Sequence, residues 1–290
     1  MIRTENQLQK ETFTLPGGVQ INAFIAGPES GTPVVLLHGG GTDHAMLSWG
    51  ETMPVLATAG YRIYAPNFPG YGDSPPDEKS ASMSGLLEIM QALMDLWKLD
   101  NAALVGLSMG GAIALGYTLA HQDRVQKLVL VGSYGIQDKV PYQFLSYLYL
   151  QIPGVVDLMW ALTRRSKMTA EYLIKGLLHN PEARTDALMA EVMEALKNSQ
   201  SQRAFSQWQR DEVGRHGMKT NYTDHLHELI IPVLLIHGAH DAGVPLEYAQ
   251  RAASRLKQGR LEVIENAGHW TQRDDPERFN QKLLEFLKTV

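Results

Sequence analysis

The chain has 290 residues, of which 44% are hydrophobic and 20% charged, with a formal net charge of −5 and no cysteine. This composition is typical of a folded globular protein and leaves little room for extended disorder. The lack of cysteine excludes disulfides, zinc–thiolate sites, iron–sulfur clusters and a cysteine nucleophile. Basic residues are scattered along the chain, so we expect no nucleic-acid partner.

Two segments bear on location. The opening residues, MIRTENQLQKETF, contain no apolar stretch of the kind that a signal peptide needs, so we expect a cytoplasmic protein. The most apolar region is residues 144–162, but Pro153-Gly154 and Asp157 interrupt it. It is too broken to span a bilayer and predicts helices that line an apolar space. We therefore expect no membrane partner.

In chain order, the first predicted element is a β-hairpin, in which Gly17-Gly18 turns between residues 12–15 and 19–27. Short apolar strands then alternate with helical periodicity. The predicted strands cover 33–41, 61–66, 102–106, 127–132, 231–238 and 260–265, and the predicted helices 48–59, 84–98, 109–121, 246–256 and 276–288. This alternation predicts an α/β fold with a mostly parallel sheet covered on both faces.

One long region breaks the alternation. Residues 133–229 contain no convincing strand and predict a helical cap inserted into the α/β core. We expect one core domain made of residues 1–132 and 230–290, with the cap as the second unit.

Ser108 stands where a predicted strand gives way to a helix, in the sequence G-L-S-M-G. A strand that enters a helix with almost no loop forces the corner residue to a positive φ and exposes its hydroxyl at the carboxyl edge of the sheet. The residues two before and two after must then be small, as Gly106 and Gly110 are. Ser108 is thus the candidate nucleophile; the alternative is a serine that only caps the helix.

A second motif, His38-Gly39-Gly40-Gly41, ends the strand at 33–41. Acyl transfer needs two N–H donors where the carbonyl oxygen becomes negative. The backbone N–H groups of Gly40 and Met109 are the candidates. We interpret His38 as a residue that holds the loop.

A serine nucleophile needs a histidine base and a carboxylate to orient it. Asp241 follows the strand at 231–238, and His269 follows the strand at 260–265. The chain order Ser, Asp, His is the one expected for successive strand ends of such a sheet. His240 competes as base but sits on the acid's own loop, and Asp274 lies too far along the chain to be the acid.

These motifs resemble the α/β-hydrolase fold enzymes that carry a helical cap. The resemblance spans essentially the whole chain and rests on HGGG, on FPGYGDS (68–74), on GLSMGG, on the loop of Asp241 and on AGHW. It implies a serine hydrolase without cofactor or metal that acts on a small molecule, as a monomer or homodimer. A serine nucleophile, rather than aspartate, argues against the haloalkane dehalogenase and epoxide hydrolase branches.

Such a site cleaves acyl compounds, and the fold does not choose among them. The apolar residues of the cap favour a medium-sized apolar or aromatic acyl group, with candidate substrate contacts at Phe144, Leu148, Trp160 and Trp270. We expect carboxylic ester hydrolysis. The alternative is the cleavage of vinylogous diketones by the similar meta-cleavage hydrolases, which usually carry asparagine where this chain has Leu107 and have a cap arginine without a clear equivalent near 170–180.

Two further hypotheses belong to other classes. His38, Asp43 and His44 lie together superficially like a metal cluster, but further ligands at fixed spacing, such as H-E-x-x-H, are missing. A non-catalytic binding protein on the same fold is the other hypothesis, and such a protein is expected to have lost part of the triad. Arg164, Arg165 and Lys167 are read either as a solvated face or as a site for a carboxylate.

Overall fold

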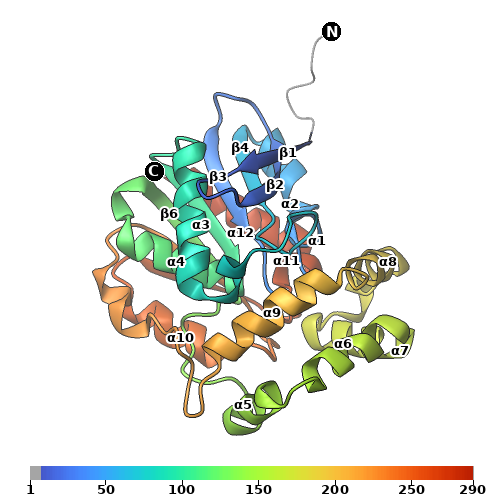
Figure 1. The fold of residues 1–290 in the computed structure, drawn as a ribbon. Helices are drawn as coiled ribbons and strands as arrows, with labels where there is room; N and C mark the ends of the chain where they lie inside the picture. The colour runs from blue at the N-terminus through green and yellow to red at the C-terminus, as the bar shows by residue number, and fades with distance from the viewer. Residues whose placement is uncertain (1–7, 290) are drawn as a thin grey trace.

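The computed structural model describes residues 8–289. The first seven residues of the opening segment and the last residue of the predicted core therefore lie outside it. An eight-stranded sheet forms the centre, with strand order β1-β2-β4-β3-β5-β6-β7-β8 (Figure 1). The strands are β1 (Gln9–Thr14), β2 (Gln20–Ala26), β3 (Thr32–Leu37), β4 (Tyr61–Pro66), β5 (Ala102–Leu107), β6 (Val125–Val131), β7 (Val233–Gly238) and β8 (Gly259–Ile264).

The sheet combines the predicted hairpin with a parallel set. Strands β1 and β2 pair antiparallel, and β2 pairs antiparallel with β4, whereas β3 to β8 run parallel. The turn between β1 and β2 contains Gly17 and Gly18, both at positive φ. The α/β fold and its mostly parallel sheet are confirmed.

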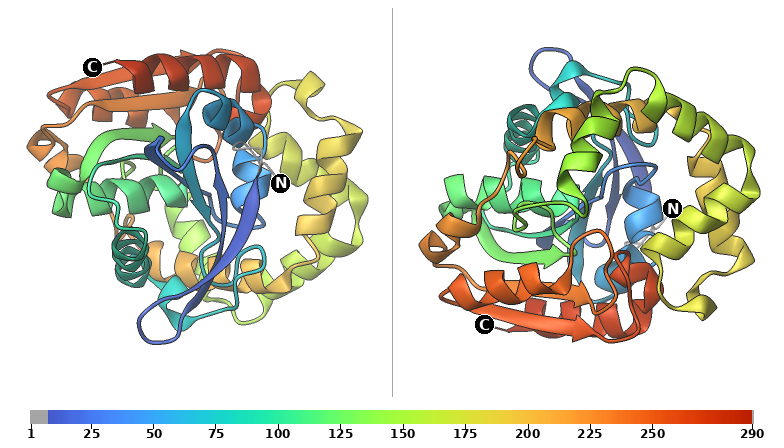
Figure 2. Two further views of the ribbon diagram at one scale, coloured as in Figure 1. Left: turned by 90° about the horizontal axis from the view of Figure 1, so that it is seen from above. Right: turned by 90° about the horizontal axis from the view of Figure 1, so that it is seen from below.

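Helices cover both faces of the sheet (Figure 2). They are α1 (Ala45–Trp49), α2 (Thr52–Thr58), α3 (Met83–Leu96), α4 (Met109–Ala120), α10 (Leu246–Arg255), α11 (Thr271–Asp274) and α12 (Pro276–Lys288). Side chains of β3 alternate between the two layers. Val35 and Leu37 pack with α3, α4 and α10, while Val34 and Leu36 pack with α1, α2 and α12. This alternation explains why the strands read as unbroken apolar runs.

The helix predicted over 48–59 forms two pieces. Helix α1 ends at Trp49, and α2 begins at Thr52. His44 caps α1 by accepting a hydrogen bond from the N–H of Leu47, so this helix starts before the predicted boundary. A periodic pattern places apolar residues on one face but does not reveal a break between two short helices.

Between β6 and β7 the chain forms five helices: α5 (Gln143–Gln151), α6 (Val155–Arg165), α7 (Lys167–Leu177), α8 (Asp186–Ala195) and α9 (Ser199–Glu212). We call residues 133–229 the cap. In Figure 1, α9 crosses in front of the core, and α5 to α8 follow one another along the lower and right edge. The cap joins both core layers, because Ala204 and Trp208 of α9 pack in one and Ile174 of α7 packs in the other.

Candidate active site

Ser108 lies at the corner between β5 and α4 with φ 50° and ψ −115°, a conformation that L residues rarely adopt. A Cβ on Gly106 would stand 2.3 Å from the carbonyl oxygen of Gly110, and one on Gly110 would stand 2.4 Å from that of Leu37. Both positions therefore exclude any side chain. Helix α4 begins at the next residue, Met109, so its free N–H groups and positive dipole end face the hydroxyl.

His269 and Asp241 are hydrogen-bonded. The His269 Nδ1 lies 2.8 Å from Oδ2 and 3.0 Å from Oδ1 of Asp241. The backbone N–H groups of Gly243 and Val244 each donate to Oδ1 of Asp241 at 2.8 Å. These bonds fix the carboxylate, and the carboxylate fixes the imidazole with Nδ1 protonated and Nε2 available as a base.

The charges of this pair shift both pKa values. Burial raises the pKa of Asp241, but His269 and the backbone N–H of Val244 outweigh burial, and the net pKa is lowered. Burial lowers the pKa of His269, but the attraction and hydrogen bond of Asp241 outweigh it, and the net pKa is raised. The structure therefore keeps the carboxylate ionised and favours the imidazolium that a general base becomes after it takes a proton.

Gly132 connects this pair to Ser108. The N–H of Ser108 donates to the carbonyl of Val131 at 2.9 Å. At the next residue, a Cβ on Gly132 would stand 2.9 Å from Oδ2 of Asp241 and 3.2 Å from Nδ1 of His269. Within residues 8–289 no hydrogen bond joins the Ser108 hydroxyl to His269, and such contacts often tighten only when substrate binds.

Within residues 8–289, the glycine turn after β3 leaves the N–H groups of Gly40 and Gly41 without a protein acceptor. Gly39 donates its N–H to Oδ2 of Asp43 at 2.7 Å. Among the described residues, neither the N–H of Gly40 nor that of Met109 donates a hydrogen bond. Asp43 also accepts from Ser48 and from the N–H of His44, and burial raises its pKa to about 6. The buried carboxylate thus holds the turn in place.

His38 holds the same turn through both ring nitrogens. Its Nδ1 lies 2.7 Å from the carbonyl oxygen of Gly39, and its Nε2 accepts the N–H of Phe68 at 3.1 Å. Burial lowers the pKa of His38 to about 3, so the ring stays neutral. These bonds give His38 the structural role expected from the sequence. They also leave it no lone pair for a metal, and residues 8–289 contain no group of three or more possible metal ligands.

The cap places two aromatic rings over the glycine turn. A Cβ on Gly40 would stand 2.2 Å from Cε2 of Phe205, so the ring of this α9 residue lies directly on the glycine. Trp160 of α6 lies beside Gly41, and its indole N–H donates to Ser206 at 3.2 Å. The role of Trp160 as a substrate contact remains a prediction. Phe205 was missed because its stretch, SQRAFSQWQRDE, reads as an ordinary amphipathic helix.

The other predicted substrate contacts lie apart from this turn. Phe144 and Leu148 of α5 are exposed, and the Phe144 ring faces the guanidinium of Arg215. Trp270 is buried in the core layer that contains α12, and its N–H donates to the carbonyl of Leu177 in α7. No described contact joins Phe144 or Leu148 to the triad, so their roles remain predictions, as does that of Trp270.

Asp274, which the sequence places too far along the chain to be the acid of the triad, holds the loop that carries His269. Its carboxylate accepts the N–H groups of Gly268, His179 and Asn180. Gly268 precedes His269, and the other two belong to the cap, so one buried side chain joins the cap to the candidate base. His179 of the cap and His240, which precedes Asp241, stack with ring centroids 3.6 Å apart.

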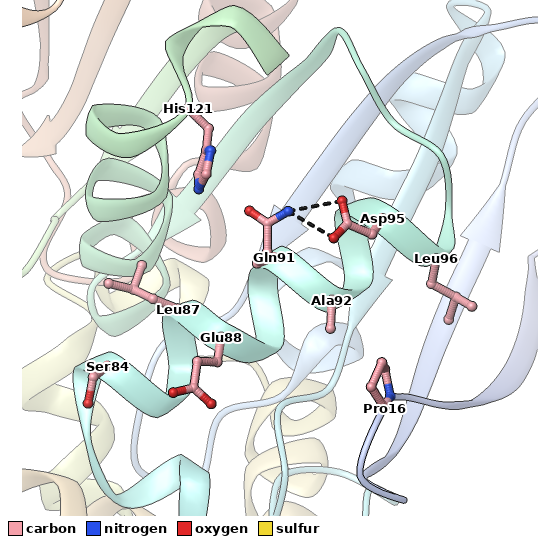
Figure 3. Close-up of a pocket in the computed structure, with 9 residues that line it drawn as sticks. All are labelled: Pro16, Ser84, Leu87, Glu88, Gln91, Ala92, Asp95, Leu96 and His121. Carbon is pink, nitrogen blue, oxygen red and sulfur yellow. Dashed lines mark hydrogen bonds between the residues drawn. The ribbon is translucent and has the colours of Figure 1, made fainter.

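A large hollow of about 860 Å³ lies elsewhere, along α3 (Figure 3). Pro16 of the β1–β2 turn and His121 after α4 border it, and Gln91 donates to Asp95 within it. Its lining includes none of the triad or glycine-turn residues. It therefore has no part in the candidate site.

Fold and site together define an α/β enzyme architecture of the hydrolase class. The chain belongs to the alpha/beta hydrolase fold family, whose profile matches residues 32–276. It is 29% identical to a 2-hydroxy-6-oxononadienedioate/2-hydroxy-6-oxononatrienedioate hydrolase of Paraburkholderia phymatum over 98% of this chain and 97% of that protein. It is 26% identical to the 2-hydroxy-6-oxo-6-(2'-aminophenyl)hexa-2,4-dienoic acid hydrolase of Metapseudomonas resinovorans, over 96% and 90% of the two chains.

Solved structures agree on the fold. A meta-cleavage product hydrolase of Pseudomonas fluorescens superposes with a TM-score of 0.79 at 26% identity, over 98% of both chains. An esterase of Exiguobacterium antarcticum superposes with a TM-score of 0.78 at 24% identity, over 97% of this chain and all of the other. The second likeness shows the fold alone.

Proposed function

We propose that the protein is a serine hydrolase in which Ser108 is the nucleophile, His269 the general base and Asp241 its orienting acid. The observation that carries this proposal is the buried His269–Asp241 hydrogen bond beside a serine held at positive φ. The N–H groups of Gly40 and Met109 serve as the two oxyanion donors.

In the first step His269 Nε2 takes the Ser108 hydroxyl proton while the oxygen attacks a substrate carbonyl carbon. The carbonyl electrons move onto the oxygen, where the two N–H donors stabilise them. The tetrahedral intermediate collapses, the leaving group departs with the proton from His269, and an acyl group remains on Ser108. A water molecule then gives a proton to His269 and attacks the acyl carbonyl, and the product leaves as a carboxylic acid while Ser108 regains its proton. One water is consumed for each bond cleaved.

For the bond cleaved, we propose the carbon–carbon bond beside the ketone of a vinylogous diketone that bears a carboxylate. The two relatives above, whose names describe 2-hydroxy-6-oxo dienoic or dienedioic acids, support this choice over our expectation of an ester. The 2-hydroxy dienoates in these names are the enol forms of such diketones, and cleavage proceeds from the keto form. There the departing carbon is joined through a double bond to the second carbonyl, which accepts the bonding electrons as a dienolate. The same carbon then receives the proton from His269.

The position of Arg164 supports the proposal that the substrate is an anion. It lies one turn of α6 beyond Trp160, and its guanidinium donates to the amide oxygen of Gln202 in α9. Within residues 8–289 no carboxylate pairs with Arg164, so its charge is not neutralised. Arg164 follows Trp160 by one helical turn, an axial rise of about 6 Å, so a cation there is suitably placed to receive a substrate carboxylate.

Ester hydrolysis is the second candidate, and Leu107 favours it. The resemblance to meta-cleavage hydrolases would place asparagine at this position. The Leu107 side chain is instead fully buried against Gly39, and it can make no polar contact with a substrate. The same triad and donors would cleave an ester, with an alcohol as the leaving group.

The proposal can be tested with a single preparation of the purified enzyme. The enzyme is assayed with a carboxylate-bearing vinylogous diketone and with an uncharged p-nitrophenyl ester of similar size. Ser108→Ala is expected to fold normally and to lose nearly all turnover of whichever compound is cleaved. Retained turnover by that variant would contradict the nucleophile.

Arg164→Gln separates the two substrate classes. It is expected to raise KM for the diketone by roughly tenfold or more, because a charge-assisted bond is worth about 1.5–3 kcal/mol. It should leave the KM for the uncharged ester unchanged. Arg165→Gln is the matched control, because Arg165 is exposed on the same helix. Equal KM values for the diketone in both variants would remove Arg164 from the substrate site.

A further inference from the structure

Exposed large apolar side chains gather on three helices of the cap. Of the fourteen such side chains in residues 8–289, eleven fall between Tyr142 and Tyr172. They are Tyr142, Phe144, Leu145, Leu148, Tyr149, Ile152, Leu158, Met159, Leu162, Met168 and Tyr172. By contrast, α5 buries only Leu150 and α6 only Val156 among the described residues. A contiguous patch of this kind marks an interaction surface.

Seven of these eleven side chains follow one stripe on each helix. Positions i, i+4 and i+7 are Leu145, Tyr149 and Ile152 in and just after α5; Leu158, Leu162 and Arg165 in α6; and Met168, Tyr172 and Lys175 in α7. Residues at this spacing lie on the same face of a helix. Two of the three stripes therefore end in a cation, a pattern of helices that lie at a lipid surface.

The charge of this segment is opposite to that of the chain. Between residues 142 and 177 lie Arg164, Arg165, Lys167 and Lys175 against Asp157 and Glu171, whereas the whole chain carries −5. Lys167 is 3.8 Å from Glu171, but Arg165 and Lys175 form no ion pair with any described residue. These two exposed cations are free to attract anionic headgroups.

The shape of α5 and α6 also fits a surface. Within residues 8–289 no single helix is long and apolar enough to cross a bilayer, but α5 and α6 together have that length and composition, with a 92° bend between them. In Figure 1 they lie with α7 at the edge of the molecule opposite β1 and β2, and the sheet lies on the other side of α9. The tyrosine rings among them suit the boundary between headgroups and acyl chains.

We propose that the stripes of α5, α6 and α7 dock the protein on an anionic lipid surface as a peripheral contact. The sequence led us to expect no membrane partner, because it showed no spanning segment; this contact needs none. A second copy of the chain fits less well. In a two-fold dimer the same patch of both copies would form the interface, which would bring the unpaired charges of Arg165 and Lys175 of both copies into it.

Vesicle flotation tests the proposal with the full chain carrying Ser108→Ala, so that hydrolysis does not alter the lipids. Phosphatidylcholine vesicles with and without phosphatidylglycerol are compared at low and high salt. The protein is expected to float with the anionic vesicles and to be released by salt. Arg165→Glu/Lys175→Glu should weaken the partition by at least about 25-fold, roughly fivefold for each cation lost.

Leu158→Gln/Tyr172→Gln should weaken the partition by about tenfold or more at either salt concentration. The matched control is Leu96→Gln/Ile230→Gln, which changes two exposed apolar residues outside the stripes and should not alter it. Thermal unfolding establishes that each variant is folded. Absence of flotation, equal binding to neutral vesicles, or partition unaffected by either stripe variant would overturn the proposal. A dimer that the stripe variant dissociates, without lipid binding, would assign the surface to a second copy instead.

Discussion

Gly40→Ala probes the contact between the cap and the candidate oxyanion donor. The added Cβ would stand 2.2 Å from Cε2 of Phe205, so the ring must retreat by about 1.2 Å to reach the 3.4 Å of an ordinary contact. The ring yields before the turn does, because Asp43 and His38 hold the turn through hydrogen bonds. The Trp208 ring stacks on the Phe205 ring, with centroids 5.7 Å apart, and restricts its movement. We expect a loss of about 1–3 kcal/mol in the free energy of unfolding.

A double-mutant cycle shows whether Phe205 is the cause. Phe205→Ala removes the obstacle, so Gly40→Ala/Phe205→Ala should be less destabilised than the sum of the single variants by about 1 kcal/mol or more, measured by denaturant unfolding. Gly110→Ala is the matched control. Its Cβ would meet the backbone oxygens of Leu37 and His38 at 2.4 and 2.5 Å, and deleting the Phe205 ring cannot relieve that. Additive costs for Gly40 and Phe205, within about 0.5 kcal/mol, would refute the contact.

Two further predictions concern the corner and the base. The free energy of unfolding of Ser108→Gly should exceed that of Ser108→Ala by about 1–2 kcal/mol, because glycine relieves the strain at φ 50°. Equal free energies of unfolding would show that no strain is stored there. Asp241→Asn should lower turnover by about 10⁴-fold, less than His269→Ala does. It should also shift the acid limb of kcat/KM to lower pH. Turnover needs neutral His269, whose pKa Asp241 raises, so activity falls as pH drops through that pKa. A pH profile unchanged by Asp241→Asn would contradict the assignment.

The sequence was sufficient to predict which residues of the site share one edge of the sheet. Ser108, Asp241 and His269 each follow a strand, and parallel strands present their carboxyl ends together. Gly106 could be read in the same way, because a Cβ there would meet Gly110 and Gly111 of the corner itself. Gly110 differs, because a Cβ there would meet the carbonyl oxygens of Leu37 and His38. Local geometry and strand order carried these predictions.

Contacts made by residues distant in sequence could not be predicted in this way. Phe205 lies on Gly40 only because α9 crosses the glycine turn, and no periodicity encodes that crossing. Asp274 appeared too far from the site to serve as the acid, yet its carboxylate fixes Gly268 beside the base. The sequence also could not show which face of α5 meets the core, because apolar character alone does not state it. Phe144 and Leu148 are exposed, and their substrate contacts remain predictions.

The two ends of the cap differ in how they are attached, and this difference bears on both proposals. At α7, the carbonyl of Leu177 accepts the N–H of Trp270, and Asp274 binds the N–H groups of His179 and Gly268. Movement of this end would therefore displace the loop of His269. At α5 and α6, a small cluster around Leu150 and Val156 packs the helices, and the side chains of Trp160 and Arg164 donate hydrogen bonds to α9. The stripes of α5 and α6 lie at this end, so they can yield at a surface with less effect on the base than the stripe of α7, which lies at the attached end.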